Sequence, residues 1–138
     1  MSQKTSLDLG LSMPQILVVD DSSIARTFHI AALAQAGYAC RAAESGAEAI
    51  ELALRQSFDA IVTDLNMPRM DGYELSKRLR GLVGYAQTPI LMITSESEDH
   101  DRMRAMDCGV NGFIIKPIEP ETLCYQLGLL IGKRAKTL

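Results

Sequence analysis

Short apolar runs alternate with amphipathic segments along the chain. A continuous apolar run predicts a strand buried on both faces, and a 3.6-residue apolar period predicts a helix. The predicted strands are residues 16–19, 38–43, 58–63, 89–93 and 113–115. The predicted helices are residues 24–36, 45–54, 72–82, 97–108 and 120–132. This alternation predicts right-handed crossovers and a five-stranded parallel sheet with helices on both faces.

Local signals support the helix boundaries. Gly37 and Gly109 each follow a predicted helix, where glycine commonly ends the last turn. Residues 45–48 (SGAE) match a capping box, and Pro120 suits the first position of the last helix. Gly72 opens the third helix after a segment of irregular sequence.

The size and charge of the chain restrict its class. With 138 residues the chain fits one globular domain, which we expect at residues 14–133, between an N-terminal arm (1–13) and a short tail (134–138). A net charge of -3 argues against nucleic acid as a direct partner, because phosphate contacts require clustered cations. The three cysteines include no C-x-x-C pair, so reduced thiols are expected.

No targeting or membrane segment is predicted. The N-terminal residues lack the apolar core of a signal peptide, and no run approaches the roughly 18 apolar residues of a membrane span. We therefore expect a cytoplasmic protein without a membrane partner.

Reactive side chains stand where four of the predicted strands end. In strand order these are Asp20 and Asp21, then Asp64, then Thr94 and Ser95, and finally Lys116 before Pro117. In open parallel sheets, ligands bind beyond the carboxyl ends of the strands. The fold is therefore expected to bring these side chains into one site.

Each of these residues also has a structural interpretation when it is taken alone. Asp20 or Asp21 could cap the first helix, and the hydroxyls after the fourth strand could cap the fourth helix. Lys116 could be a surface lysine, and Asp64 could form an Asx-turn, although no helix begins directly after it.

Charge balance favours a shared site. Two carboxylates about 4 Å apart repel by roughly 4 kcal/mol near a protein surface, so three of them require positive charge nearby. Lys116 and one divalent cation would balance the three acids, and Mg²⁺ fits because it binds few carboxylates and shares its other positions with phosphate oxygens. Because no Gly-rich phosphate loop is present, we expect a phosphoryl group on a carboxylate rather than a bound nucleotide.

Four segments together resemble the response-regulator receiver domains of two-component signalling, in particular the single-domain chemotaxis regulators. The resemblance covers about residues 14–133 and rests on four motifs in order, ILVVDD (16–21), VTDLNMPRMDGYEL (62–75), ILMITS (90–95) and GFIIKP (112–117). It implies a flavodoxin-like (βα)5 fold with strand order 2-1-3-4-5.

The resemblance also implies a role for each acidic residue. Asp64 would accept a phosphoryl group from a sensor histidine kinase or a phosphotransferase. Asp21 and Asp64 would bind Mg²⁺ directly, Asp20 would act through water, and the backbone carbonyl of Asn66 would complete the protein ligands; Mn²⁺ can substitute.

The remaining motif residues would bind the phosphoryl group or respond to it. Lys116 would pair with Asp64 and then with phosphoryl oxygens, while Thr94 would donate its hydroxyl and Ser95 its backbone N–H. The resemblance also implies a cis peptide bond before Pro117, although only ~5% of peptide bonds before proline are cis in folded proteins. Phe113 stands at the position of the family's rotating aromatic residue.

Lifetime and output follow from the same resemblance. Asn66 and Glu96 occupy the two positions that tune the lifetime of the aspartyl phosphate, although the charge of Glu96 could equally favour a helix N-terminus. A downstream protein would bind the fourth helix, the fifth strand and the fifth helix. Few residues follow the last helix, so we expect output by protein contact rather than through an attached domain.

Two other classes are compatible with part of the pattern. A haloacid-dehalogenase-like phosphatase also uses an aspartate nucleophile with Mg²⁺, but it requires a D-x-D pair on the first strand, where this chain has adjacent Asp20 and Asp21. A receiver-like binding module that is never phosphorylated is the other alternative. Phosphoryl uptake by Asp64, without turnover of a free substrate, distinguishes the receiver from both.

Overall fold

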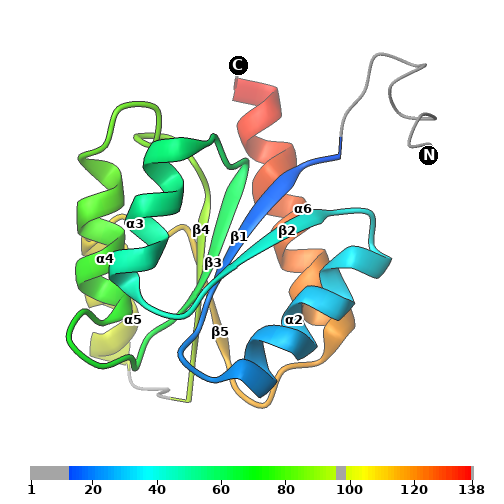
Figure 1. The fold of residues 1–138 in the computed structure, drawn as a ribbon, viewed down its shortest axis with the longest axis horizontal. Coiled ribbons are helices and arrows are strands. Elements are labelled where there is room, and N and C mark those ends of the chain that lie inside the picture. The colour runs from blue at the N-terminus through cyan, green and yellow to red at the C-terminus, as the bar shows by residue number, and fades with distance from the viewer. Residues whose placement is uncertain (1–12, 96–98, 138) are drawn as a thin grey trace.

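Five strands and five helices alternate in the computed structural model, which describes residues 13–95 and 99–137. The first half of the chain forms β1 (Gln15–Val19), α2 (Ser23–Gln35), β2 (Ala39–Ala43), α3 (Gly46–Arg55) and β3 (Ala60–Asp64). The second half forms α4 (Gly72–Arg80), β4 (Ile90–Thr94), α5 (Asp99–Asp107), β5 (Gly112–Ile115) and α6 (Pro120–Thr137). The strands are parallel in the order β2-β1-β3-β4-β5, which confirms the predicted flavodoxin-like fold (Figure 1).

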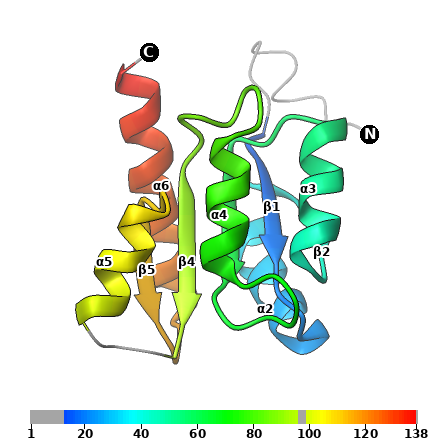
Figure 2. The ribbon, with the colours of Figure 1, turned by 90° about the vertical axis from the view of Figure 1, so that its left-hand side faces the viewer.

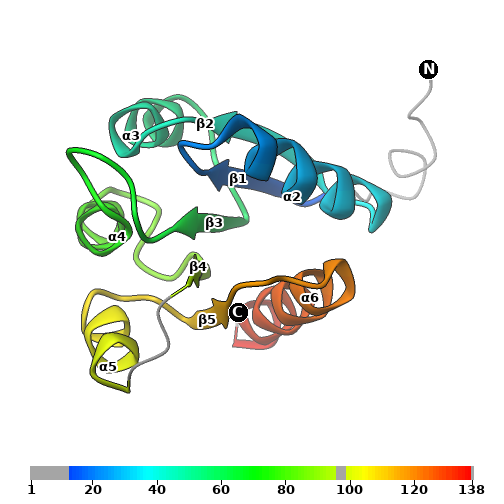
Figure 3. The ribbon, with the colours of Figure 1, turned by 90° about the horizontal axis from the view of Figure 1, so that it is seen from below.

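Helices cover both faces of the sheet. Seen along the strands, α3, α4 and α5 lie on one side and α2 and α6 on the other (Figure 3). Alternate residues of β1 serve the two layers, since Leu17 and Val19 pack in one hydrophobic cluster and Ile16 and Val18 in the other. Burial on both faces explains why the strands are continuous apolar runs rather than alternating ones.

The carboxyl ends of the strands meet at one edge of the sheet (Figure 2). Asp64, the last residue of β3, is in register with Ile93 of β4, and Thr94 at the end of β4 is in register with Ile115 of β5. This register brings the reactive residues of the sequence pattern together.

Some predicted boundaries were wrong. Asp64 belongs to β3 instead of following it, because the ladder with β4 extends one residue further than the apolar run. Helix α4 ends at Arg80, since the N–H of Gly81 turns back to the carbonyls of Arg78 and Leu79. Helix α6 continues beyond Gly132 to Thr137, into the predicted tail. The predicted arm up to residue 12 lies outside the described residues, as does the predicted start of α5.

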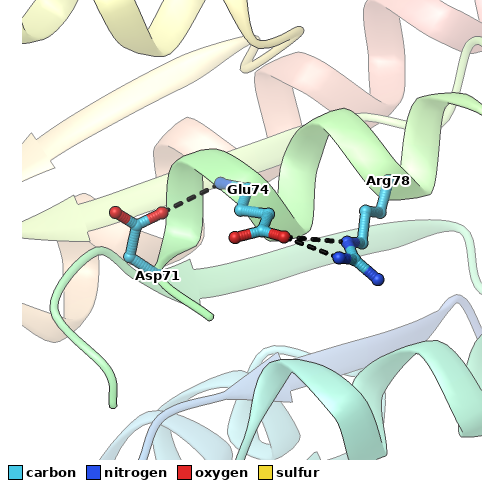
Figure 4. Close-up of polar contacts among 3 residues, drawn as sticks. All are labelled: Asp71, Glu74 and Arg78. Carbon is cyan, nitrogen blue, oxygen red and sulfur yellow. Dashed lines mark hydrogen bonds and ion pairs between the residues drawn. The ribbon is translucent and has the colours of Figure 1, made fainter. Parts of the chain in front are cut away.

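Side-chain caps fix the start of α4. The Asp71 carboxylate accepts a hydrogen bond from the Glu74 N–H at 2.9 Å, and the Glu74 carboxylate accepts two from the Arg78 guanidinium one turn later (Figure 4). At the start of α3, Ser45 and Glu48 form the predicted capping arrangement, although Glu48 reaches the N–H of Glu44 rather than that of Ser45.

Arg80, at the end of α4, joins the segments that precede β4 and β5, at the amino ends of these strands. Its guanidinium donates to the carbonyls of Tyr85, Thr88 and Gly109 and to the side chain of Asn111. No sequence pattern predicted this network. In the part of the chain that the structure describes, no helix is both long and apolar enough to span a bilayer.

Candidate functional site

Three acidic side chains converge at the carboxyl edge of the sheet. Carboxylate oxygens of Asp20, Asp21 and Asp64 all lie within 4.8 Å of one another. Asp20 and Asp64 are buried, whereas Asp21 is exposed at the mouth of the cluster. The predicted acidic cluster is therefore formed by residues from the ends of β1 and β3.

All polar groups of Asp20 except one carboxylate oxygen form hydrogen bonds. Its N–H donates to the Ala43 carbonyl at 3.1 Å, its Oδ1 accepts from the Ser22 N–H at 2.9 Å, and its carbonyl accepts from the Arg26 guanidinium at 2.7 Å. Its Oδ2 is buried and has no hydrogen-bond partner among the described residues. An unpaired buried carboxylate oxygen lowers the stability of the folded protein, so a positively charged ligand would be bound favourably here.

The alternative roles of Asp20 and Asp21 as helix caps are wrong. The N-terminal cap of α2 is Ser22, whose Oγ accepts a hydrogen bond from the Ala25 N–H at 3.2 Å. Neither acidic residue caps the start of α2, and both carboxylates lie in the acidic cluster.

Asp64 pairs with the lysine that follows β5. The Lys116 Nζ lies 3.2 Å from the Asp64 Oδ1, so Lys116 is not a lysine that points only to solvent. Burial raises the pKa of the Asp64 carboxyl above its ordinary value, the charge of Asp20 raises it further, and Lys116 opposes both effects. One ammonium therefore does not fully offset the burial of this carboxylate beside a second one.

The donor atoms fit a hard divalent cation. Carboxylate oxygens are the ligands that Mg²⁺ prefers, and it typically takes one or two of them while keeping several waters. Asp20, Asp21 and Asp64 offer such oxygens within one small volume, and the Oδ2 of Asp20 lacks any other partner there. Asp21 is exposed, so the cluster borders solvent on its side.

The ends of β4 and β5 form the other wall of the site. Thr94 is buried, its carbonyl accepts from the Lys116 N–H at 2.7 Å, and Ser95 after it is exposed. The bond between Lys116 and Pro117 is cis, the isomer that the resemblance implies. Phe113 is half-buried, and the Arg102 guanidinium lies 5.5 Å from the centre of its ring.

The loop after Asp64 is irregular but anchored. Asn66 is exposed and Met67 is buried, so the loop turns alternate residues outward and into the core. Arg69 has a φ of 70°, in the left-handed region, between a Pro68 carbonyl and a Met70 N–H that are hydrogen-bonded at 2.8 Å. Such a backbone is strained for a residue with a side chain, and strain of this kind persists only where the surroundings enforce it.

Sequence reasoning missed two residues that border the site. Arg26 follows the acid pair by several residues and carries no motif. His29 is buried on α2, where burial lowers the pKa of its imidazole, Asp20 raises it and Lys116 lowers it. The sequence offered one signal for His29, its place on the apolar face of the predicted helix, one turn before Leu33. The prediction for Glu96 lies outside the described residues.

Comparison with known proteins identifies the family. Residues 16–127 match the response regulator receiver domain. Chemotaxis protein CheY1 of Helicobacter pylori is 38% identical over 120 residues, which are 86% of this chain and 97% of that protein. A gliding motility regulatory protein of Myxococcus xanthus is 32% identical over 102 residues, 74% of this chain but only 13% of that protein. The transcriptional regulatory protein ResD of Bacillus subtilis is matched over half its length.

Solved structures give the same result. Chemotaxis protein CheY4 of Vibrio cholerae has a TM-score of 0.84 and 38% identity, covering 86% of this chain and 99% of that one. The receiver domain of the sensor histidine kinase PA1611 of Pseudomonas aeruginosa, solved with a magnesium ion in its active site cleft, has a TM-score of 0.81 and 30% identity, covering 88% and 99%. By motif order, strand order and sequence, the chain belongs to the response-regulator receiver domains of bacterial two-component systems, with the chemotaxis regulators among its relatives.

Proposed function

We propose that this protein takes a phosphoryl group from a sensor histidine kinase, or from a phosphotransferase, onto Asp64. The main support is the pairing of a buried Asp64 with Lys116 inside a cluster of three carboxylates. A carboxylate that is buried, flanked by an ammonium and open to solvent through Asp21 suits the role of a covalent acceptor. Transfer to this acceptor, rather than turnover of a free substrate, is its proposed chemistry.

The residues of the site would share the transfer step. An oxygen of Asp64 attacks the phosphorus of the donor, the P–N bond to the donor histidine breaks, and its electron pair stays on the imidazole nitrogen. Asp20, Asp21, Asp64 and the Asn66 carbonyl would hold Mg²⁺, with Mn²⁺ as a substitute. When bound, the cation neutralises charge on the transferring group. Lys116 supplies the remaining positive charge, 3.2 Å from the acceptor carboxylate.

Residues on β4 and β5 would respond to the new charge. An acyl phosphate carries more charge and more acceptor oxygens than a carboxylate, which favours hydrogen bonds from the Thr94 hydroxyl and the Ser95 N–H. Thr94 lies beside β5 in the sheet, so its movement can reach Phe113. Phosphorylation would shift the protein toward an active state only by stabilising that state more than the inactive one.

The proposed output surface is formed by α5, β5 and α6. Large apolar side chains are exposed on both helices that flank β5, namely Met103 and Met106 on α5 and Tyr125 and Leu129 on α6. Exposed apolar groups of this kind are typical of protein contact surfaces. The partner would therefore be another protein, reached in the cytoplasm, with neither nucleic acid nor membrane as a direct partner.

The lifetime of the phosphoryl group would depend on Asn66 and Glu96. Both are polar residues able to position an attacking water, and Asn66 is exposed two residues after the proposed acceptor. We propose that they give a short-lived aspartyl phosphate. Slower loss of the phosphoryl group in Glu96→Ala would support this role, whereas unchanged decay would remove it.

Intact mass measurement tests the proposed chemistry. The protein is incubated with acetyl phosphate, with Mg²⁺ or with a chelator, as wild type and as Asp64→Asn. We expect the mass of one phosphoryl group to be added only to the wild type and only with Mg²⁺. Absence of uptake would mean either that only a protein kinase can phosphorylate Asp64 or that the site is silent, as in the binding module. Steady release of phosphate from phosphate monoesters would favour the phosphatase.

A further inference from the structure

One basic side chain reaches back from α2 to the backbone of the acidic cluster. The guanidinium of Arg26 donates a hydrogen bond of 2.7 Å to the backbone carbonyl of Asp20. Arg26 is half-buried, and its own N–H donates to the Ser22 carbonyl at 3.0 Å in the first turn of the helix. The side chain therefore links the first turn of α2 to Asp20, the first residue after β1.

The hydrogen bonds around Asp20 leave one atom of the residue available. The N–H is bound to the Ala43 carbonyl, the carbonyl oxygen to Arg26 and Oδ1 to the Ser22 N–H. Only Oδ2 has no partner among the described residues, although Asp20 is just 2% exposed. The Ser22 N–H thus holds the other oxygen of the carboxylate, and Arg26 holds the backbone of the same residue.

We propose that Arg26 is a positioning residue for the divalent cation. By holding the Asp20 carbonyl, it keeps the turn between β1 and α2 in the conformation in which Oδ2 lies within the acidic cluster. Groups that orient the ligands of a metal, without binding the metal themselves, commonly change metal affinity by 10–100-fold when they are removed. The inference rests on the proposed function, because it requires the cluster to bind the cation.

Electrostatics alone predicts the opposite effect. Arg26 carries a positive charge close to a site for a cation, so its removal should reduce repulsion and strengthen Mg²⁺ binding. Positioning predicts weaker binding when the hydrogen bond is lost. The sign of the change in Mg²⁺ affinity therefore distinguishes a residue that holds Asp20 from a residue that only adds charge.

Isothermal titration of Mg²⁺ into four proteins tests the proposal. The proteins are the wild type, Arg26→Gln, Arg26→Lys and Arg41→Gln, which removes the same charge from β2, where Arg41 contacts Gln56. We expect Arg26→Gln to raise the Kd on the order of tenfold, Arg26→Lys to recover part of the affinity, and Arg41→Gln to match the wild type.

Thermal unfolding in chelator shows whether each variant is folded, and the rise in Tm on adding Mg²⁺ gives a second readout of binding. A purely structural role for Arg26 would lower the Tm in chelator while leaving the Kd of the folded protein unchanged. That result, or tighter binding by Arg26→Gln, would overturn the inference while the proposed function stands. A wild type that does not bind Mg²⁺ would instead overturn the metal site, and the inference with it.

Discussion

At the scale of single residues, the site concentrates negative charge that the fold only partly offsets. Asp64 is buried next to Asp20, and Lys116, whose side chain is 37% exposed, is the cation that the structure pairs with it. The raised pKa of Asp64 means that the folded protein holds a proton on this carboxyl more tightly than the unfolded chain does. An ionised Asp64 therefore costs stability unless a cation binds.

Asp64→Asn is accordingly expected to stabilise the protein at neutral pH in chelator. For an acid whose pKa is raised by folding, the stabilising contribution is complete below the unfolded pKa and is lost as the pH rises through the folded pKa. Neutralising the side chain should add roughly 1 kcal/mol to the free energy of unfolding at pH 7, the usual size of a point substitution's effect. The gain should shrink in acid, where the wild-type carboxyl is protonated.

Urea unfolding at neutral and acid pH measures this difference. Glu51→Gln is a suitable control, because it removes one negative charge from an exposed position on α3. A variant Asp64→Asn that is less stable than the wild type at pH 7 would mean that the ion pair with Lys116 outweighs the burial of Asp64.

At the scale of elements, the start of α4 is packed directly against the end of β3. The Gly72 N–H donates to the Leu65 carbonyl at 2.8 Å, and a Cβ on Gly72 would lie 2.6 Å from the Asp64 carbonyl oxygen and 3.0 Å from the Leu65 Cα. Gly72 is therefore required by close approach of two backbones, not by an unusual φ. Helix α4, which follows the loop, therefore helps to fix the position of Asp64, the proposed acceptor.

Gly72→Ala should consequently disturb both stability and the site. We expect a loss of about 1–3 kcal/mol in the free energy of unfolding, typical of overpacking, together with slower phosphoryl uptake from acetyl phosphate. Gly132→Ala is the matched control on α6, where a Cβ would meet no atom within 4 Å and alanine is the better helix former. Equal stability of Gly72→Ala and the wild type would contradict this packing argument.

The elements and most of the site could be predicted from the sequence, because apolar runs and strand-end residues are local signals. Asp20, Asp21, Asp64 and Lys116 come together as expected once the strands are parallel. The contact of Arg26 with Asp20 and the network of Arg80 depend on how helices lie across the sheet. Long flexible side chains that bind backbone carbonyls leave no periodic pattern, so these contacts could not be predicted.

Boundaries were less predictable for a related reason. The end of β3 is set by pairing with β4, which extends the strand to include Asp64 beyond its apolar residues. The cap of α2 falls on Ser22 rather than on either acid, since the Ser22 Oγ accepts the Ala25 N–H in the first turn of the helix. Both results depend on partners that the sequence alone does not identify.

At the scale of the whole molecule, the fold joins one acidic edge to a surface of exposed apolar side chains. The acidic residues and Lys116 lie at the carboxyl ends of the strands. Strand β5, which contains Phe113, is followed directly by Lys116, which pairs with Asp64. The α5 and α6 helices flank that strand and expose Met103, Met106, Tyr125 and Leu129. A change at Asp64 is therefore connected through one strand to the proposed partner surface.

The central claim is that Asp64 itself carries the phosphoryl group. Protein treated with acetyl phosphate and Mg²⁺ is reduced with borohydride, which converts an aspartyl phosphate to homoserine, and its peptides are mapped by mass. We predict homoserine at Asp64 and at no other aspartate, and none when Mg²⁺ is chelated. Conversion at Asp20 or Asp21, or a phosphoryl group found only on a serine, threonine or histidine, would contradict the account.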